Sequence, residues 1–436
     1  MNQTDDLKLL RLQEEKKYIN TDFIEELARQ QISELVHWAN KEIFVPIGGE
    51  LTFDITLGPP NAGVIIRSDR PVHPRMEFRL SLISEIYADA FTFPIVCRRI
   101  GLETNTLQNF NETEQFRDCH VRFNSPLPEL NESSVAELFR PICETFVTLN
   151  LERRSGDDRQ LQAGDVRCRF IMFELMLVWT FFHELGHIVQ GHYRMHTKSP
   201  SLIGDCVFFE LDDTIPTHDD HSGMDMVSAA MDRAVAPDLA AQARELMADA
   251  EATDQTLKYL VMRGRLNFSV WYLLLCSTGC MFQRFYKGYQ ESLELSHARH
   301  PHPAIRDTAS NLLGINWLAD YLVASKNVQN RVDAAMPLAY LSARASLMTG
   351  LFRAYRVEKR DSPDHLPSYM ALILDSEEQQ RSYIKALLPE IERQLPMVLE
   401  YHLIDMHSLE YWFEFMKAAA NATEQGDSAG ARSSLG

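Results

Sequence analysis

The sequence is short of positive charge. Lysine and arginine together number 43, against 61 aspartates and glutamates, and the formal charge at pH 7 is −18. A general nucleic-acid-binding surface needs the opposite sign, because it has to attract a polyanion. We therefore expect no nucleic-acid partner.

Cysteine is also scarce, with seven residues in the whole chain. The number is odd and the residues are scattered, unlike the framework that staples small secreted domains. The first residues, MNQTDDLKLLRLQEEKK, contain no apolar core for a secretory signal. These absences predict free thiols and a cytoplasmic location. Cys276 and Cys280 are four residues apart, but their apolar helical surroundings favour buried, inert thiols over a redox or metal pair.

Long hydrophobic runs are missing as well. Phe170–Phe182 is 13 residues long and contains Glu174, while Phe268–Phe282 is 15 residues long and is interrupted by serine, threonine and glycine. Both are shorter than the about 20 apolar residues that a membrane-spanning helix needs. We expect both runs to be buried helices, with no insertion into a membrane.

What is present is an ordinary globular composition, 45% hydrophobic and 24% charged, in a chain of 436 residues that has room for two or three domains. Apolar residues recur at helical spacing from Asp22 to about Asn40. Alternating apolar residues predict strands at Leu51–Leu57 and Met76–Leu82, with a break at the proline-containing segment Asp69–Pro74. A helix is expected from Ser84 to Phe91.

Polar, aperiodic segments indicate the domain organisation. Residues 152–165 are expected to form a surface linker, and the acidic stretch 197–224 a long irregular loop. Beyond Arg306 the pattern is helical to about Ala420, with a break at Asp361–Pro367. The sequence thus predicts an α+β, predominantly helical fold with a small N-terminal sheet. Its expected parts are an N-terminal α+β region (1–165), a catalytic core (166–310), a C-terminal helical region (311–420) and a disordered tail (421–436).

The segment His183-Glu184-Leu185-Gly186-His187 follows the first apolar run. In a helix, residues four apart lie on one face about 6 Å from each other, so His183 and His187 can ligate one zinc ion. Glu184 lies on the adjacent edge, where it can take a proton from a zinc-bound water and deliver it to a leaving amine. Gly186 is a small residue at which another backbone can approach.

A catalytic zinc also needs a third protein ligand and an open fourth position. A metzincin would have a histidine six residues after His187, but that residue is Tyr193. The segment Arg244–Ala252 offers a carboxylate instead. Glu245 and Asp249 are four residues apart on one helix face, so Glu245 can ligate while Asp249 accepts the outer N–H of a ligating histidine.

Together, HELGH and the later ExxAD resemble the motifs of gluzincin metallopeptidases of the HtpX and CAAX-prenyl-endopeptidase type. A third segment, HPHPAIR at His300–Arg306, is similar to their downstream HPPxxxR segment. The resemblance covers roughly residues 170–310 and implies a zincin-like core. It also implies zinc binding by His183, His187 and Glu245, acid–base catalysis by Glu184, a supporting role for Asp249, and oxyanion stabilisation by His300 or Arg306.

Two departures limit what the resemblance implies. Those relatives usually have membrane-spanning helices, which are not expected here, and His302 stands in place of the second proline of the downstream motif. Soluble proteins with a similar motif set include the Lit-type phage-exclusion peptidases and the ImmA-type repressor-cleaving peptidases. We therefore expect a soluble zinc endopeptidase with selected protein substrates. A zinc-binding regulatory or sensor module and a zinc hydrolase of a non-peptide amide stay open as alternatives, and the oligomeric state is not predicted.

Peptidases of this kind bind an extended peptide along an exposed strand edge, for which the two expected strands are candidates. His192 and His196 extend the helix face and could bind substrate or metal, although polar positions at a helix end are the simpler interpretation. His218 and His221 could form an accessory metal site, but a solvated acidic loop is the simpler interpretation, and the same holds for His297.

Overall fold

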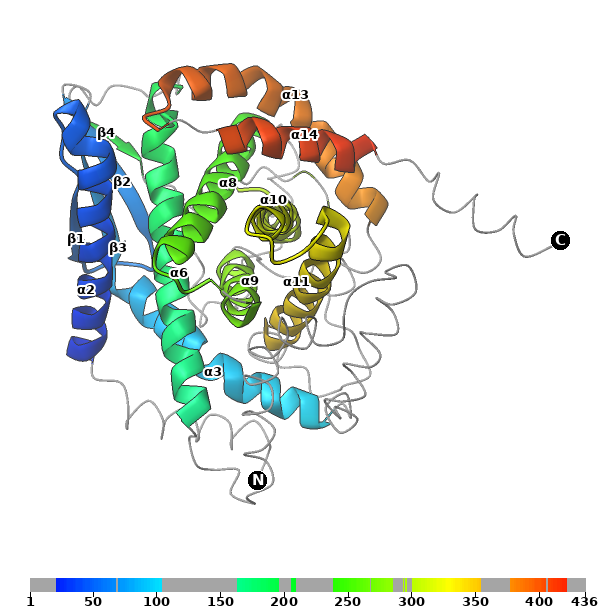
Figure 1. Cartoon of the computed structure of the whole chain (residues 1–436). Coiled ribbons are helices and arrows are strands. Elements are labelled where there is room, and N and C mark those ends of the chain that lie inside the picture. Colours follow the sequence, from blue (N-terminus) through cyan, green and yellow to red (C-terminus); the bar gives the residue numbers. More distant parts are fainter. Residues whose placement is uncertain are drawn as a thin grey trace, which may run out of the picture.

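The computed structural model describes residues 21–67, 70–103, 163–195, 205–208, 238–266, 268–284, 293, 295, 300–353, 377–404 and 407–421. Within these ranges the chain is mostly helical, with one small sheet beside the helices (Figure 1). This confirms the predominantly helical α+β architecture. Most of the predicted linker at 152–165, the break at 361–367 and the tail beyond residue 421 lie outside these ranges.

The described strands are β1 (Thr52–Thr56), β2 (Ala62–Arg67), β3 (Arg70–Arg79) and β4 (Asp205–Phe208), in the order β1-β3-β2-β4. β1 is parallel to β3, and β2 is antiparallel to its two neighbours, β3 and β4. β2 and β4 were not predicted. Four of the six residues of β2 are buried, so the strand lacks the alternation that marks a half-buried one. β4 lies within the stretch 197–224, which was predicted to be irregular throughout.

The segment Asp69–Pro74 was predicted as a break, but from Arg70 onward it belongs to β3. Pro71 and Pro74 precede the residues of β3 that pair with β1, which start at Arg75. On the other side, the pairing with β2 is interrupted by a shift in register. Proline, which has no N–H to donate to a neighbouring strand, is tolerated where the ladder is interrupted in this way.

The strand predicted at Met76–Leu82 is wrong beyond Arg79, because helix α3 (Leu80–Glu103) begins there. The expected helix Ser84–Phe91 is thus the middle of a longer one. Its buried residues follow helical spacing: Leu82, Ile83, Ile86, Tyr87 and Ala90. β3 is paired on both sides, so it cannot offer the free edge for a peptide that was expected of it.

Helix α2 (Thr21–Ala39) is the amphipathic helix expected from Asp22 to Asn40. Its buried residues recur every three or four positions, at Ile24, Ala28, Ile32 and Leu35. The chain then continues through a π-helical turn, Asn40–Phe44, and a 3₁₀ turn, Val45–Ile47, into β1. These turns connect the first helix to the sheet.

The two apolar runs form α6 (Ala163–Val189) and α9 (Phe268–Gln283). α6 runs between the sheet, beside which α2 lies, and the helices α9 and α8 (Leu239–Met262), and it packs against β2, α2, α3, α8 and α9 (Figure 1). Every residue from Leu175 to Gln190 is buried. Both runs are therefore buried helices, as predicted, and no helix in the described part of the chain has the length and apolar content of a membrane span.

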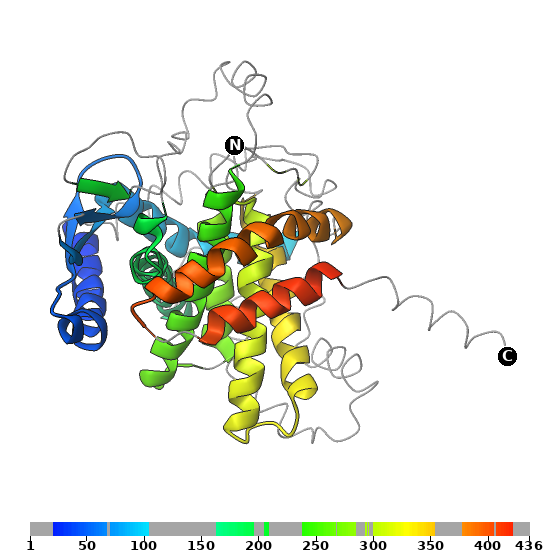
Figure 2. The ribbon, with the colours of Figure 1, turned by 90° about the horizontal axis from the view of Figure 1, so that it is seen from above.

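The C-terminal part is helical as predicted and comprises α10 (Pro303–Ala324), α11 (Arg331–Arg353), α13 (Glu377–Tyr401) and α14 (His407–Asn421). α13 and α14 lie side by side and pack across α8 and α10 (Figure 2). The boundary that the sequence suggested between residues 310 and 311 falls inside α10. Both α13 and α14 pack directly on α8, the helix that carries Glu245.

Candidate metal centre

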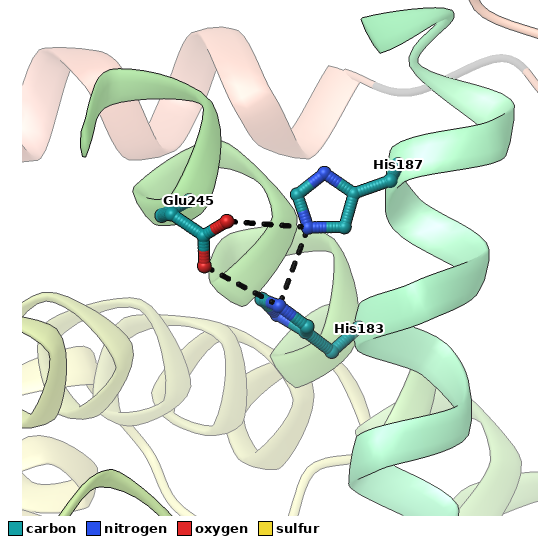
Figure 3. A group of neighbouring side chains, drawn as sticks. All are labelled: His183, His187 and Glu245. Atoms are coloured by element: carbon teal, nitrogen blue, oxygen red, sulfur yellow. Dashed lines mark hydrogen bonds and ion pairs between the residues drawn. The ribbon is translucent and has the colours of Figure 1, made fainter. Parts of the chain in front are cut away.

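α6 places His183 and His187 on the same face, one turn apart. Their Nε2 atoms lie 3.3 Å from each other, and the two residues are only 6% and 2% exposed. The indole ring of Trp179 stacks on His183 with 5.3 Å between the ring centroids. Packing therefore holds both imidazoles with their Nε2 atoms turned toward a common point (Figure 3).

Glu245, on α8, turns its carboxylate toward the same point (Figure 3). Oε2 lies 3.5 Å from Nε2 of His183, and Oε1 lies 3.7 Å from Nε2 of His187. Donor atoms at the corners of a tetrahedron around a zinc ion, with bonds of about 2.0–2.2 Å, lie about 3.3–3.6 Å apart. Each imidazole nitrogen thus has one carboxylate oxygen near this separation, and one donor atom from each side chain lies within 4.8 Å of the other two, so the buried His–His–Glu group could hold a single metal ion.

The close approach of α6 and α8 takes place at Gly186, between the two histidines. A Cβ atom there would lie 3.2 Å from Cβ of Glu251 and 3.4 Å from Cα of Ala248. One turn further on, Nε2 of Gln190 donates a hydrogen bond of 2.9 Å to the carbonyl of Met247. The missing side chain of Gly186 and the buried side-chain amide of Gln190 thus set the distance between α6 and α8. These two helices carry the His–His–Glu group, which is called the metal group below.

Asp249 lies one turn after Glu245 and faces the outer nitrogen of His183. Its Oδ1 is 3.0 Å from Nδ1 of His183. Arg306 holds the same carboxylate with two hydrogen bonds of 2.7 Å, from Nε to Oδ2 and from Nη2 to Oδ1. Asp249 is therefore within reach of the Nδ1–H of His183, the position that its expected role requires.

His300 and Arg306, the two residues expected near the oxyanion, are both close to the metal group. Nδ1 of His300 lies 2.8 Å from Oε2 of Glu245, and Nη2 of Arg306 lies 3.4 Å from the same oxygen. Arg306 is 1% exposed, and its guanidinium lies over the ring of Phe282. These contacts are with the carboxylates of the site, so stabilisation of an oxyanion by either residue stays a prediction.

The site favours a positive charge between its carboxylates. Burial by itself lowers the pKa of His183, but hydrogen bonding and attraction by Asp249 and Glu245 outweigh it and raise the pKa to about 9. Burial also opposes ionisation of Glu245, yet His300 and His183 hold the pKa of its carboxyl well below the ordinary value. Burial lowers the pKa of His187, which keeps this ring neutral. An ionised carboxylate and a neutral imidazole are the forms that bind metals.

Glu184 follows His183 in α6 and is 3% exposed. Burial raises the pKa of its carboxyl to about 7. Within the described part of the chain, no group offers its Oε2 a hydrogen bond. A buried carboxyl group with an unused oxygen and a pKa near neutrality is suited to taking up and returning a proton.

His192 contacts His187 in a way that the sequence interpretation did not anticipate. The residue is fully buried, and its Nδ1 lies 2.7 Å from Nδ1 of His187. A spacing of five residues would place it on another face of a continuous helix. The helix ends before it, however, because Gly191 adopts a left-handed conformation with φ of 65°. The turn brings the ring of His192 back against His187.

Other candidate residues lie away from this group or outside the described residues. Cys276 and Cys280 are buried free thiols in α9, as predicted. His302 caps α10, with its Nδ1 accepting a hydrogen bond of 3.1 Å from the amide of Ala304. The described ranges do not include His196, His218, His221 or His297.

Comparison of the chain with protein-family models, with curated proteins and with solved structures gave no match. A fold by itself does not determine an activity, so function has to be inferred from the chemistry of the site. That site is a buried group of two imidazoles and one carboxylate that could hold a metal ion.

Proposed function

We propose that the chain is a zinc-dependent metalloendopeptidase of the gluzincin kind. In this proposal His183, His187 and Glu245 bind the metal, and Glu184 is the general base and then the general acid. The observation that carries it is the convergence of two imidazole nitrogens and one carboxylate, with one donor atom of each side chain within 4.8 Å of the others, beside a buried carboxyl group with an unused oxygen. The zincin-like core and the kinship with gluzincins belong to the same proposal.

Zinc is the ion that these donors suit best. Two imidazole nitrogens and one carboxylate oxygen are typical zinc ligands, whereas magnesium and calcium prefer oxygen ligands alone. Three protein ligands leave a fourth position open, which distinguishes catalytic from structural zinc sites.

Glu184 supplies the proton transfers of the proposed reaction. Zinc, when bound, would act as a Lewis acid that polarises a peptide carbonyl and acidifies a water molecule. The Glu184 carboxylate would accept the proton of the attacking water and pass it to the nitrogen of the leaving amine. A structural or sensor site has no use for an additional buried carboxyl group, and for this reason we favour hydrolysis over that alternative.

In this mechanism His300 and Arg306 are positioning residues, which orient the carboxylates of Glu245 and Asp249. His300 contacts the ligand carboxylate of Glu245, and Arg306 bridges from that carboxylate to Asp249. The two cationic or hydrogen-bonding side chains thus hold the oxygens in place before a metal arrives. Such preorganisation keeps the Glu245 carboxylate turned toward the two imidazoles.

The proposed substrate is a protein or peptide bound in an extended form. Of the two strands considered for this purpose, β3 is paired on both sides, while β1 pairs with β3 alone among the described strands. An extended segment could add to the outer edge of β1 through main-chain hydrogen bonds. The cytoplasmic location rests on the sequence and is proposed together with this substrate class.

Substitution of Glu184 by glutamine tests the proposal. Glutamine keeps the size of the side chain but cannot accept the proton, so zinc content and stability should match the wild type, while peptide cleavage should fall by about 10²–10⁴-fold. Proteomes of cells that express each form should differ in new peptide termini. Equal biological activity of the two forms would favour the sensor module. Loss of activity without any new termini would favour a non-peptide amide as substrate.

A further inference from the structure

The metal group is accompanied by a second histidine contact that the peptidase mechanism does not use. Nδ1 of His192 lies 2.7 Å from Nδ1 of His187, and the two ring centroids are 4.8 Å apart. His192 is 0% exposed, so bulk water does not compete for this contact. The distance is that of a strong hydrogen bond between ring nitrogens.

The geometry of the metal group determines which ring donates. His187 turns Nε2 toward His183 and Glu245. A ring nitrogen that binds a metal carries no proton, so the proton of a neutral His187 has to be on Nδ1. Nδ1 of His192 is then the acceptor, and His192 itself carries its proton on Nε2.

We infer that His192 is a positioning residue that holds His187 in the Nδ1–H tautomer and in the ring orientation that metal binding requires. This inference rests on the metal centre of the proposed function. It gives each ligating imidazole a partner at its outer nitrogen, Asp249 for His183 and His192 for His187. An imidazole in this role adds no negative charge beside Glu245 and Asp249.

The turn that presents His192 is built from several independent contacts. Gly191 has φ of 65°, and a Cβ atom there would lie 2.7 Å from Cβ of Tyr401. The amide of Leu403 donates a hydrogen bond of 2.9 Å to the carbonyl of Val189. The end of α13 is therefore docked on the end of α6, and it holds the turn in the conformation that returns His192 to His187.

Zinc affinity, measured by competition with a chromophoric chelator, tests the inference. Loss of an outer partner of a ligating histidine weakens metal affinity by about 10–100-fold, and we expect this of His192→Ala. His192→Gln should recover part of the loss, because its amide oxygen can accept the Nδ1–H of His187. His302→Asn is the matched control. It changes another buried histidine but keeps a side chain that can cap α10, so its zinc affinity should equal that of the wild type.

The outcomes separate this inference from the proposed function. Wild-type zinc affinity in His192→Ala would overturn the role of His192 and leave the peptidase proposal standing. If His192→Ala binds zinc more weakly and the wild type cleaves no peptide, the role of His192 is supported and the peptidase proposal is overturned. A wild type that binds no zinc would overturn both.

Nuclear magnetic resonance of the wild type covers the case in which His192→Ala does not fold. In zinc-loaded protein with ¹⁵N-labelled histidine, we expect the His187 ring to carry a proton on Nδ1 and none on Nε2. An unprotonated Nδ1 on His187 would overturn the inference without any variant.

Discussion

Gly186 in α6 lies against Glu251 in α8 with space for little more than a hydrogen atom, since a Cβ atom at Gly186 would be 3.2 Å from Cβ of Glu251, a contact only slightly too short. Alanine should be tolerated here, because its higher helix propensity, about 1 kcal/mol, offsets a contact that is only slightly too short. Leucine must push the helices apart and draw Glu245 away from the histidines. We expect Gly186→Leu to lose about 1–3 kcal/mol of unfolding free energy and at least about tenfold in zinc affinity.

Urea denaturation and chelator competition measure the two effects separately, and Gly186→Ala is the control for the change of backbone freedom. A leucine variant with the zinc affinity of the wild type would show that the spacing of α6 and α8 does not determine the metal site.

Two glycines with the same backbone conformation give a second matched comparison. Gly191 and Gly264 have φ of 65° and 62°, but a Cβ at Gly264 would meet nothing within 4 Å, whereas one at Gly191 would collide with Tyr401. Gly264→Ala should therefore cost only the left-handed strain, about 1–2 kcal/mol. Gly191→Ala should cost about 1–3 kcal/mol more and should also weaken zinc binding by displacing His192. Equal losses in urea denaturation would contradict the docking of α13 on this turn.

The buried pair of Arg306 and Asp249 predicts a stability effect that is separate from catalysis. Arg306→Met leaves the carboxylate of Asp249 without its two hydrogen bonds, which should cost about 3–5 kcal/mol in the metal-free protein. Lysine keeps the charge but cannot bond both oxygens, so Arg306→Lys should be intermediate. The double variant Arg306→Met/Asp249→Leu should regain stability but not zinc affinity. If the Arg306 guanidinium stabilised only an oxyanion, Arg306→Met would have the same unfolding free energy as the wild type, and this result would contradict the prediction.

Asp307 predicts a pH dependence of stability. Burial raises the pKa of its carboxyl to about 6, and this effect outweighs the hydrogen bond from Ser346. Because the folded state binds this proton more tightly than the unfolded state, the contribution to stability is full at low pH and is lost as pH rises through about 6. Asp307→Asn should match the wild type near pH 4 and exceed it by roughly 3 kcal/mol at pH 8. Urea denaturation of the metal-free proteins checks this, and a difference that does not vary with pH would contradict it.

The residues of the candidate metal centre were predictable from the sequence because helix geometry is local. His183 with His187, and Glu245 with Asp249, lie on common faces of α6 and α8 whatever the rest of the fold. The meeting of those two helices was inferred from what a zinc site needs, and the structure brings the residues together.

Features that depend on distant contacts were not predictable in the same way. The position of His192 requires the left-handed Gly191 and the docking of Tyr401, neither of which leaves a periodic pattern. Pro71 was interpreted as a strand breaker, because the sequence does not show that pairing with β1 starts only at Arg75 and that the register with β2 shifts opposite this segment. Arg306 was expected to face an oxyanion, and its bidentate bond to Asp249 became apparent only from the fold.

X-ray absorption spectroscopy of the zinc-loaded protein is the most direct test of the metal centre. We expect one zinc per chain with two imidazole nitrogens and oxygen donors at about 2.0–2.2 Å, and loss of the protein oxygen ligand with weaker binding in Glu245→Ala. Sulfur donors at about 2.3 Å, or a spectrum and an affinity unchanged in Glu245→Ala, would contradict a site made by His183, His187 and Glu245.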